Sequence, residues 1–160
     1  MSLSTVAEYL KEYSLENRII TFDVSSATVA LAAEALGVDG ARIAKTLSFD
    51  IGGTCILVVT AGDAKIDNAK FKGFFHKKAT MLSHDKVEKM TGHPVGGVCP
   101  FCVKDGTKIY LDVSLKRFDT VYPAAGTPSS AVKLTVDELY VASHSCGWID
   151  VCKDWQDTLE

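Results

Sequence analysis

Residues 45–60 read KTLSFDIGGTCILVVT and carry the strongest β signal in the chain. Apolar and β-branched residues fill 46–49 and 55–60, and Asp-Ile-Gly-Gly at 50–53 separates the two runs. Two β-rich runs around a glycine-bearing turn are typical of paired strands. We therefore expect strands at 46–49 and 55–60, joined by a tight turn.

Upstream of this stretch the pattern alternates between helix and strand. Residues 4–13 have helical apolar spacing with Ser4 as a cap, and residues 18–22 are short and β-branched. An alanine-rich segment at 26–36 predicts a second helix that ends at Gly37.

Downstream, several strands follow one another directly. Residues 65–73 are predicted to be helical or irregular, Ser83 caps a short helix ending at Gly92, and a capping box at 135–138 opens a late helix. The remaining strand candidates are 108–113, 120–122 and 131–134. This irregular order favours a mixed α+β sheet. Because no repeat or linker divides the chain, we expect one domain over residues 1–160.

The bulk composition is that of an ordinary globular protein, with 160 residues, 47% apolar and 23% charged. No apolar run approaches the roughly 20 residues of a spanning helix, and the N-terminus lacks a secretory pattern, so the expected location is the cytosol. A net charge of −3 argues against non-specific coating of nucleic acid but leaves room for a local basic patch. The odd number of cysteines, five, favours reduced thiols that are mostly buried.

Two glycine-bearing loops are candidates for ligand binding. Residues 91–101 read TGHPVGGVCPF, and such a loop can aim several N–H groups at a carbonyl or phosphate oxygen. Residues 122–130 read YPAAGTPSS and combine small residues with hydroxyls. Both stretches also suit ordinary surface turns, and the sequence leaves the two interpretations open.

Lys45 stands between apolar neighbours at the start of a predicted strand. Its side chain could extend to solvent without a specific partner. Alternatively, it supplies a fixed cation beside a reacting ester or a phosphate.

Five short segments occur in an order that resembles the YbaK/EbsC family. They are AKTL at 44–47, AGD at 61–63, GHPVGGVCPF at 92–101, IYLDVSL at 109–115, and AAG at 124–126 with AVKLT at 131–135. The family includes free-standing deacylases and the editing insert of bacterial prolyl-tRNA synthetases. One departure is Cys102, where relatives often have glycine.

The resemblance implies a mixed β-sheet or barrel-like core with flanking helices, and a pocket between the glycine loop and Lys45. It implies hydrolysis of amino acids from mischarged tRNA, with small residues such as alanine or cysteine on proline tRNA as substrates. The implied partner is the acceptor end of mischarged tRNA. The resemblance leaves room for an aminoacyl-tRNA synthetase as a second partner. It implies no metal or organic cofactor, and no binding to a membrane or to DNA.

Site residues follow from these segments. The candidate catalytic groups are Lys45 and the backbone N–H groups of Gly96 and Gly97. The candidate substrate contacts are Asp63, His93, Val98, Cys99, Pro100, Gly126 and Ser129. Asp63 and His93 could equally be a turn residue and a loop imidazole. The other histidines have no motif around them and are interpreted as surface residues.

RNA binding is assigned to four lysines that interleave with phenylalanines at positions 71, 74 and 75. They are Lys70, Lys72, Lys77 and Lys78. Phosphate pairing with aromatic stacking suits an unpaired acceptor end. A solvated loop whose phenylalanines lie in the core would give the same pattern.

Two other classes of function remain as alternatives. Cys99 and Cys102 could form a metal or redox site with His93, or with His144, Cys146 and Cys152 further on. The chain has no second C-x-x-C motif and no ligand spacing typical of zinc sites, which argues against a metal or redox site. A module that binds RNA without hydrolysis is the other alternative. Because no G-x-S-x-G elbow or Ser-His-Asp set is evident, we expect water, a ribose hydroxyl or a substrate thiol to attack the ester.

Overall fold

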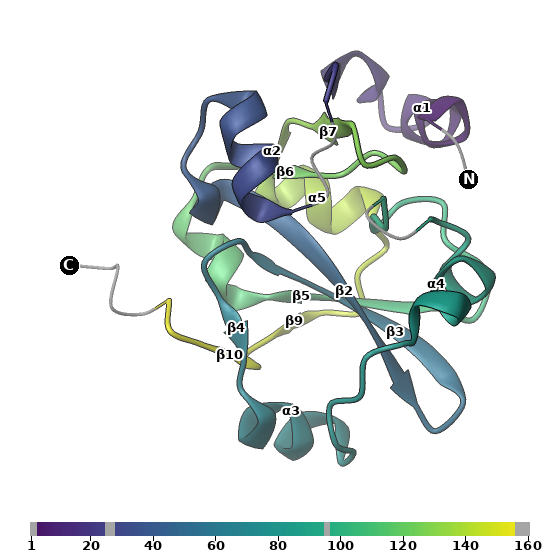
Figure 1. The fold of residues 1–160 in the computed structure, drawn as a ribbon, viewed down its shortest axis with the longest axis vertical. Helices are drawn as coiled ribbons and strands as arrows, with labels where there is room; N and C mark the ends of the chain where they lie inside the picture. The colour runs from purple at the N-terminus through teal and green to yellow at the C-terminus, as the bar shows by residue number, and fades with distance from the viewer. Residues whose placement is uncertain (1–2, 25–27, 95–96, 156–160) are drawn as a thin grey trace.

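A mixed six-stranded sheet, ordered β8-β6-β2-β3-β5-β9, forms the centre of the molecule (Figure 1). The structure, a computed structural model, describes residues 3–24, 28–94 and 97–155. The strands of this sheet are β2 (Ile43–Ile51), β3 (Thr54–Ala61), β5 (Lys108–Asp112), β6 (Thr120–Pro123), β8 (Leu134–Thr135) and β9 (Trp148–Ile149). β2–β3 and β6–β8 pair antiparallel, whereas β2–β6, β3–β5 and β5–β9 pair parallel. The curled, mixed sheet confirms the predicted fold class.

The predicted hairpin is present as β2 and β3. Ile51 pairs with Thr54 across a two-residue loop, in which Gly52 and Gly53 have φ angles of 61° and 93°. Positive φ at both loop positions matches the twist of the flanking strands, and glycine adopts it without strain. The Gly53 N–H also donates to the Asp50 carboxylate at 2.8 Å.

Two further pairs of short strands flank the main sheet. β1 (Ile19–Thr21) pairs with β7 (Ser130–Val132), and β4 (Lys65–Ile66) pairs with β10 (Cys152–Lys153). The strand expected at 131–134 is therefore two strands in different sheets, and the segment 65–73 begins with a strand. β9 and β10, which are only two residues long, were not predicted from the sequence.

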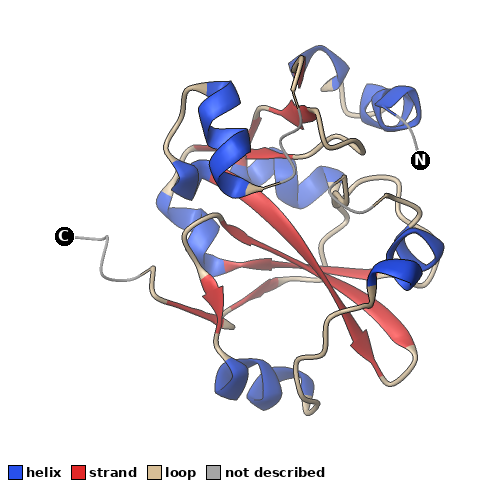
Figure 2. Cartoon of the chain, in the orientation of Figure 1, coloured by secondary structure: helices blue, strands red, loops and turns tan. Residues whose placement is uncertain are grey.

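The helices lie around the periphery of the sheet (Figure 2). They are α1 (Leu3–Lys11), α2 (Val29–Leu36), α3 (Asn68–Phe75), α4 (His84–Thr91) and α5 (Val136–Ala142). α2 is capped by the Thr28 side chain and ends at Gly37, and the start predicted for it at residue 26 lies outside the described residues. The predicted capping box of α5, Thr135 with Glu138, is confirmed. Within the described residues, no helix is long and apolar enough to cross a membrane.

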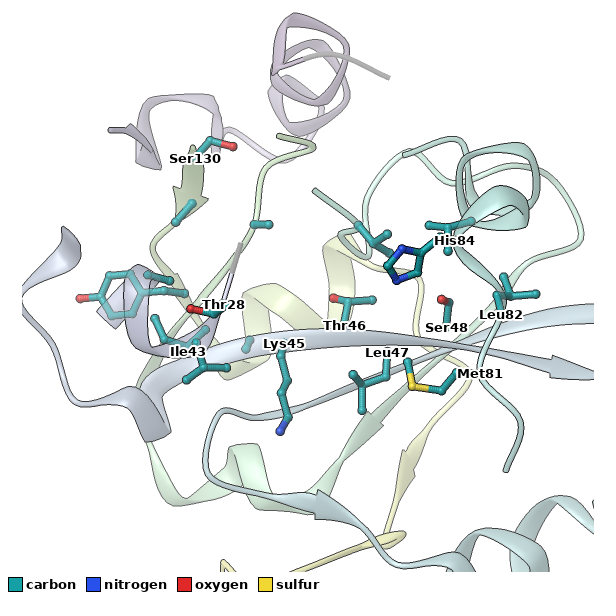
Figure 3. A pocket seen from close by; sticks show the side chains of 18 residues that line it. Thr28, Ile43, Lys45, Thr46, Leu47, Ser48, Met81, Leu82, His84 and Ser130 are labelled. Atoms are coloured by element: carbon teal, nitrogen blue, oxygen red, sulfur yellow. The ribbon is translucent and has the colours of Figure 1, made fainter. Parts of the chain in front are cut away.

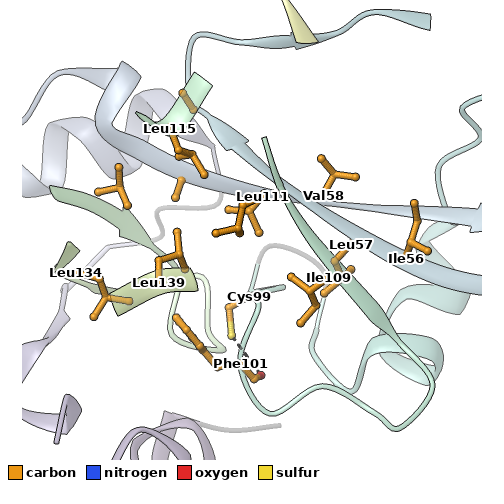
Figure 4. Packing of buried hydrophobic residues seen from close by; sticks show 14 of the residues in the cluster. Ile56, Leu57, Val58, Cys99, Phe101, Ile109, Leu111, Leu115, Leu134 and Leu139 are labelled. Atoms are coloured by element: carbon orange, nitrogen blue, oxygen red, sulfur yellow. Dashed lines mark hydrogen bonds between the residues drawn. The ribbon is translucent and has the colours of Figure 1, made fainter. Parts of the chain in front are cut away.

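One hydrophobic core joins the sheet to its surroundings (Figure 4). From Cys55 to Ala61 every residue of β3 is buried, because both faces of this strand are covered. The five cysteines, all within the described residues, are free, and three of them are buried, which confirms the expectation from the sequence. The core thus encloses β3, whereas its neighbour β2 is only partly buried.

Candidate active site

A cavity of about 410 Å³ opens along β2 (Figure 3). Its walls come from α2, β2, β7, α4 and the segment that precedes α4, and most of the lining side chains are apolar. The polar members of the lining are Thr28, Lys45, Thr46, Ser48, His84 and Ser130. A mostly apolar cavity with a few polar groups is typical of a site for a small ligand.

Lys45 and Thr46 point to opposite sides of β2. Successive side chains of a strand alternate between its two faces, so Thr46 and Ser48 share one face. Figure 3 shows these two hydroxyls on the same side as His84, whereas the ammonium of Lys45 lies across the strand from them. The cavity therefore meets β2 along its edge, with residues of both faces in its lining.

The ammonium of Lys45 is held by the turn between β3 and β4. Its Nζ donates to the carbonyl oxygen of Ala64 at 2.5 Å and to that of Gly62 at 3.5 Å. Burial lowers the pKa of Lys45, and the neighbouring Cys152 and Asp63 oppose this shift. The lysine is thus a partly desolvated cation in a fixed position.

The same turn explains why the segment AGD has its glycine. A Cβ on Gly62 would lie 2.0 Å from the carbonyl oxygen of Gly40, a distance that no side chain can adopt. Asp63 forms a bidentate ion pair with Arg117, in which one N–O distance is 2.9 Å. The pair holds the turn to the segment after β5, and the role of Asp63 as a substrate contact stays a prediction.

The glycine loop packs against the second small-residue loop. A Cβ on Gly97 would lie 2.9 Å from both the carbonyl oxygen of Gly126 and the Cα of Thr127, so these predicted site residues meet through their backbones. The N–H of Gly97 donates to the Pro94 carbonyl at 2.9 Å, within the loop itself. Val98 lines the cavity. Gly96 lies outside the described residues, and its role stays a prediction.

His93 and Cys99 are fully buried beneath this loop and do not line the cavity. His93 Nε2 donates to the Phe101 carbonyl oxygen at 2.7 Å, and burial lowers the pKa of the imidazole, which favours the neutral form. Burial raises the pKa of Cys99 to about 12, so it is a thiol at neutral pH. Both residues hold the loop in the core (Figure 4 shows Cys99 beside Phe101).

The remaining candidates, Pro100 and Ser129, do not line the cavity. Pro100 and Cys102 line a second hollow with Tyr9, on another part of the loop. Ser129 is absent from the cavity lining, whereas its neighbour Ser130 contributes to it. Substrate contacts by Pro100 and Ser129 stay predictions.

The four candidate RNA-binding lysines differ in their surroundings. Lys70 pairs with the Asp150 carboxylate at 3.1 Å and donates to the Cys152 carbonyl oxygen. Lys72, Lys77 and Lys78 are exposed. Lys77 and Lys78 precede Met81, an exposed residue that lines the cavity. These two lysines therefore lie on a segment that leads to the cavity, and Lys70 is tied to the C-terminal strand.

Five polar residues of the cavity were not predicted from the sequence: Thr28, Thr46, Ser48, His84 and Ser130. Strand alternation after Lys45 would have placed Thr46 and Ser48 on one face, but their exposure to a cavity depends on distant elements. Among the described residues, no group of three or more His, Cys, Asp or Glu side chains is placed to hold a metal ion.

Several known proteins and structures are similar to this chain. The sequence matches the aminoacyl-tRNA editing domain family over residues 24–140. It is 53% identical to the uncharacterized protein YwhH of Bacillus subtilis (strain 168), over 98% of this chain and 100% of that protein. The crystal structure of the hypothetical protein APE2540 has a TM-score of 0.82 and 28% identity, and covers 92% of this chain and 99% of its own. A candidate trans-editing enzyme for prolyl-tRNA synthetase has a TM-score of 0.80 and 26% identity, and covers 96% of this chain and 100% of its own. This chain belongs to the aminoacyl-tRNA editing domain family.

Proposed function

We propose that the protein hydrolyses the ester of mischarged aminoacyl-tRNA in trans, with the aminoacylated 3′ end bound in the cavity along β2. The observation that supports this most directly is the position of the cavity, which covers the edge of β2 beside Lys45 in a fold shared with an editing family. The related structure described as a trans-editing enzyme for prolyl-tRNA synthetase is similar over nearly its whole length.

Hydrolysis of this ester requires placement and charge stabilisation more than a strong nucleophile, because the ester is already activated. Water adds to the carbonyl carbon, the bond from that carbon to the ribose oxygen breaks, and the ribose hydroxyl leaves with a proton. A ribose hydroxyl or a cysteine thiol of the substrate is the alternative attacking group. The cavity hydroxyls of Thr46 and Ser48 can orient the attacking group without forming a covalent intermediate.

Lys45 supplies positive charge next to this reaction. Two backbone carbonyls fix its ammonium, and partial burial strengthens its field compared with a solvated lysine. An ammonium has three donors. We assign the donor not used by these carbonyls to a phosphate or carbonyl oxygen of the substrate.

The RNA approaches along the exposed segment 76–84. Lys77 and Lys78 contact phosphates there, and Met81 and His84 stand at the rim of the cavity, where they contact the terminal nucleoside. Lys70 is assigned to the fold, because its ammonium is paired with Asp150.

The amino acid removed is small, such as alanine or cysteine on proline tRNA. The cavity volume of about 410 Å³ has to hold both the aminoacyl group and part of the terminal nucleoside, which leaves little room for a large side chain.

A panel of tRNAs, each charged with a correct or an incorrect amino acid, tests this function. Catalytic amounts of protein should release many equivalents of a small amino acid from proline tRNA and leave correctly charged prolyl-tRNA intact. Binding of the charged tRNA without release of amino acid would overturn the proposal and identify a binding module instead.

A further inference from the structure

The outer edge of β2 has a gap in its hydrogen bonding, and the gap lies at the cavity. β6 pairs with this edge only at Ile43 and Ala44. Beyond the gap, residues 80–82 pair with it: the Leu82 N–H donates to the Ser48 carbonyl at 3.1 Å, and the Asp50 N–H donates to the Thr80 carbonyl at 2.8 Å. Between these two partners lies the stretch 45–47.

Thr46 presents both of its backbone groups to this gap. In an extended strand the N–H and C=O of one residue point to the same edge, and alternate residues share that edge. Because Ser48 and Asp50 bond outward, Thr46 also faces outward, whereas Lys45 and Leu47 face β3. Within the described part of the chain, no backbone group bonds to Thr46 at this edge.

The Thr46 side chain adds an independent observation. Its Oγ1 is buried and has no hydrogen-bond partner among the described residues, although the residue lines the cavity. Buried hydroxyls are nearly always bonded, so an unpartnered one beside a cavity indicates a missing ligand. Three groups of one residue (N–H, C=O and hydroxyl) are thus available at the same place.

We propose that the aminoacyl group of the substrate docks opposite Thr46 as a strand one residue long. Two residues that face each other in an antiparallel hydrogen-bonded pair exchange both N–H···O bonds. An aminoacyl ester carries its α-ammonium and carbonyl oxygen in the same relation as any residue. The ammonium donates to the Thr46 carbonyl, and the Thr46 N–H donates to the ester carbonyl oxygen, which becomes negative during attack.

This docking mode, which rests on the proposed hydrolysis of aminoacyl-tRNA, also positions the substrate's side chain. Side chains of directly opposed residues lie on the same face of a sheet. The amino acid side chain therefore lies on the face of Thr46 and Ser48, towards His84 (Figure 3). Selection by size occurs on this face, away from the ammonium of Lys45.

The test has a substrate arm and a protein arm. In the first, alanyl- and propionyl-tRNA(Pro), which differ by the α-ammonium, are compared after each rate is divided by its own uncatalysed rate. In the second, Thr46→Pro removes the outward N–H without loss of a bond to β3, and Thr46→Val keeps the N–H but removes the hydroxyl. Melting temperature and circular dichroism establish that both variants fold.

We expect the catalytic acceleration to be at least about tenfold larger for the alanyl ester than for the propionyl ester. We expect the deacylation rate to fall on the order of a hundredfold in Thr46→Pro, clearly more than in Thr46→Val. Equal accelerations of the two esters would overturn the docking mode, even where Thr46→Pro does not fold. If the wild-type protein cleaves no mischarged tRNA in the panel, the proposed function fails; cleavage without discrimination between the two esters removes only the docking of Thr46.

Discussion

The ammonium of Lys45 donates to the backbone carbonyl of Ala64 across 2.5 Å, on the side of β2 away from the hydroxyl of Thr46. The lysine therefore has two separable properties: it ties β2 to the turn after β3, and it carries a charge. Lys45→Met removes both properties, whereas Lys45→Arg keeps the charge and changes the contacts with the turn.

Lys45→Met keeps most of the length and apolar contact of the side chain but removes the charge. We expect deacylation to fall on the order of a hundredfold, because a charge that stabilises the transition state is lost. The melting temperature, measured in parallel, should fall as well, because the buried carbonyl oxygen of Ala64 loses its donor. Lys45→Arg keeps the charge in a planar, longer group and should recover part of the rate. A wild-type rate in Lys45→Met would remove the lysine from the mechanism.

The pH dependence of the enzyme should report the lowered pKa of Lys45. Activity that needs the ammonium falls as the pH rises through this pKa, at a lower pH than for a solvated lysine, whereas Lys45→Arg should lack this decline. Uncatalysed ester hydrolysis is subtracted at each pH.

The same shift has a consequence for stability. Between the folded and unfolded pKa values the unfolded chain binds more protons, so the free energy of unfolding contributed by this group rises with pH. Denaturant titrations should show the wild type gaining stability relative to Lys45→Met as the pH increases across this interval. A constant difference would contradict the shift.

Gly97→Ala tests the contact between the two small-residue loops. The new Cβ would lie 2.9 Å from the backbone of residues 126 and 127, so one loop has to move, at a cost of about 1–3 kcal/mol. Because Val98 lines the cavity, deacylation should fall as well. The matched control is Gly73→Ala in α3, where nothing lies within 4 Å and stability should rise by up to about 1 kcal/mol. Equal stabilities of the two variants would contradict the packing.

The double variant Lys77→Ala/Lys78→Ala tests the RNA path. If each lysine neutralises one phosphate of a single strand, the slope of log affinity against log salt should become shallower by about 1.4, at roughly 0.7 per contact. Lys70→Ala is the control: its ammonium is already paired with Asp150, so this variant should leave the slope unchanged. A change of slope in Lys70→Ala alone would place the RNA on the other side of α3.

The sequence predicts those features that depend on neighbouring residues. The β2–β3 hairpin, the cap at Gly37 and the capping box at Thr135 each need only a few adjacent positions, and all three are present. The mixed sheet also follows from the order of the elements. Lys45 could be singled out through the resemblance to the YbaK/EbsC family, because a lysine at the start of a strand also suits a side chain that extends to solvent.

Other features depend on segments far apart in the chain and could not be predicted. The contact of Gly62 with Gly40, and the ion pair of Asp63 with Arg117, arise only when the turn after β3 meets other parts of the fold. His93 lies in a segment with the composition of a ligand-binding loop, yet packing places its side chain in the core. Likewise, the cavity over Thr46 exists because α2 and α4 stand on either side of an incompletely paired strand edge.

The surroundings of Lys45 are completed by β10, far from β2 in the sequence. β10 pairs with β4 through Cys152 and Ile66, and Cys152 lies close enough to Lys45 to affect its pKa. Protein synthesis proceeds from the N-terminus, so β2 and the Gly62 turn leave the ribosome well before β10. A growing chain therefore has its lysine long before it has the segment that packs beside it. The environment of Lys45 is thus complete only once β10 has paired with β4.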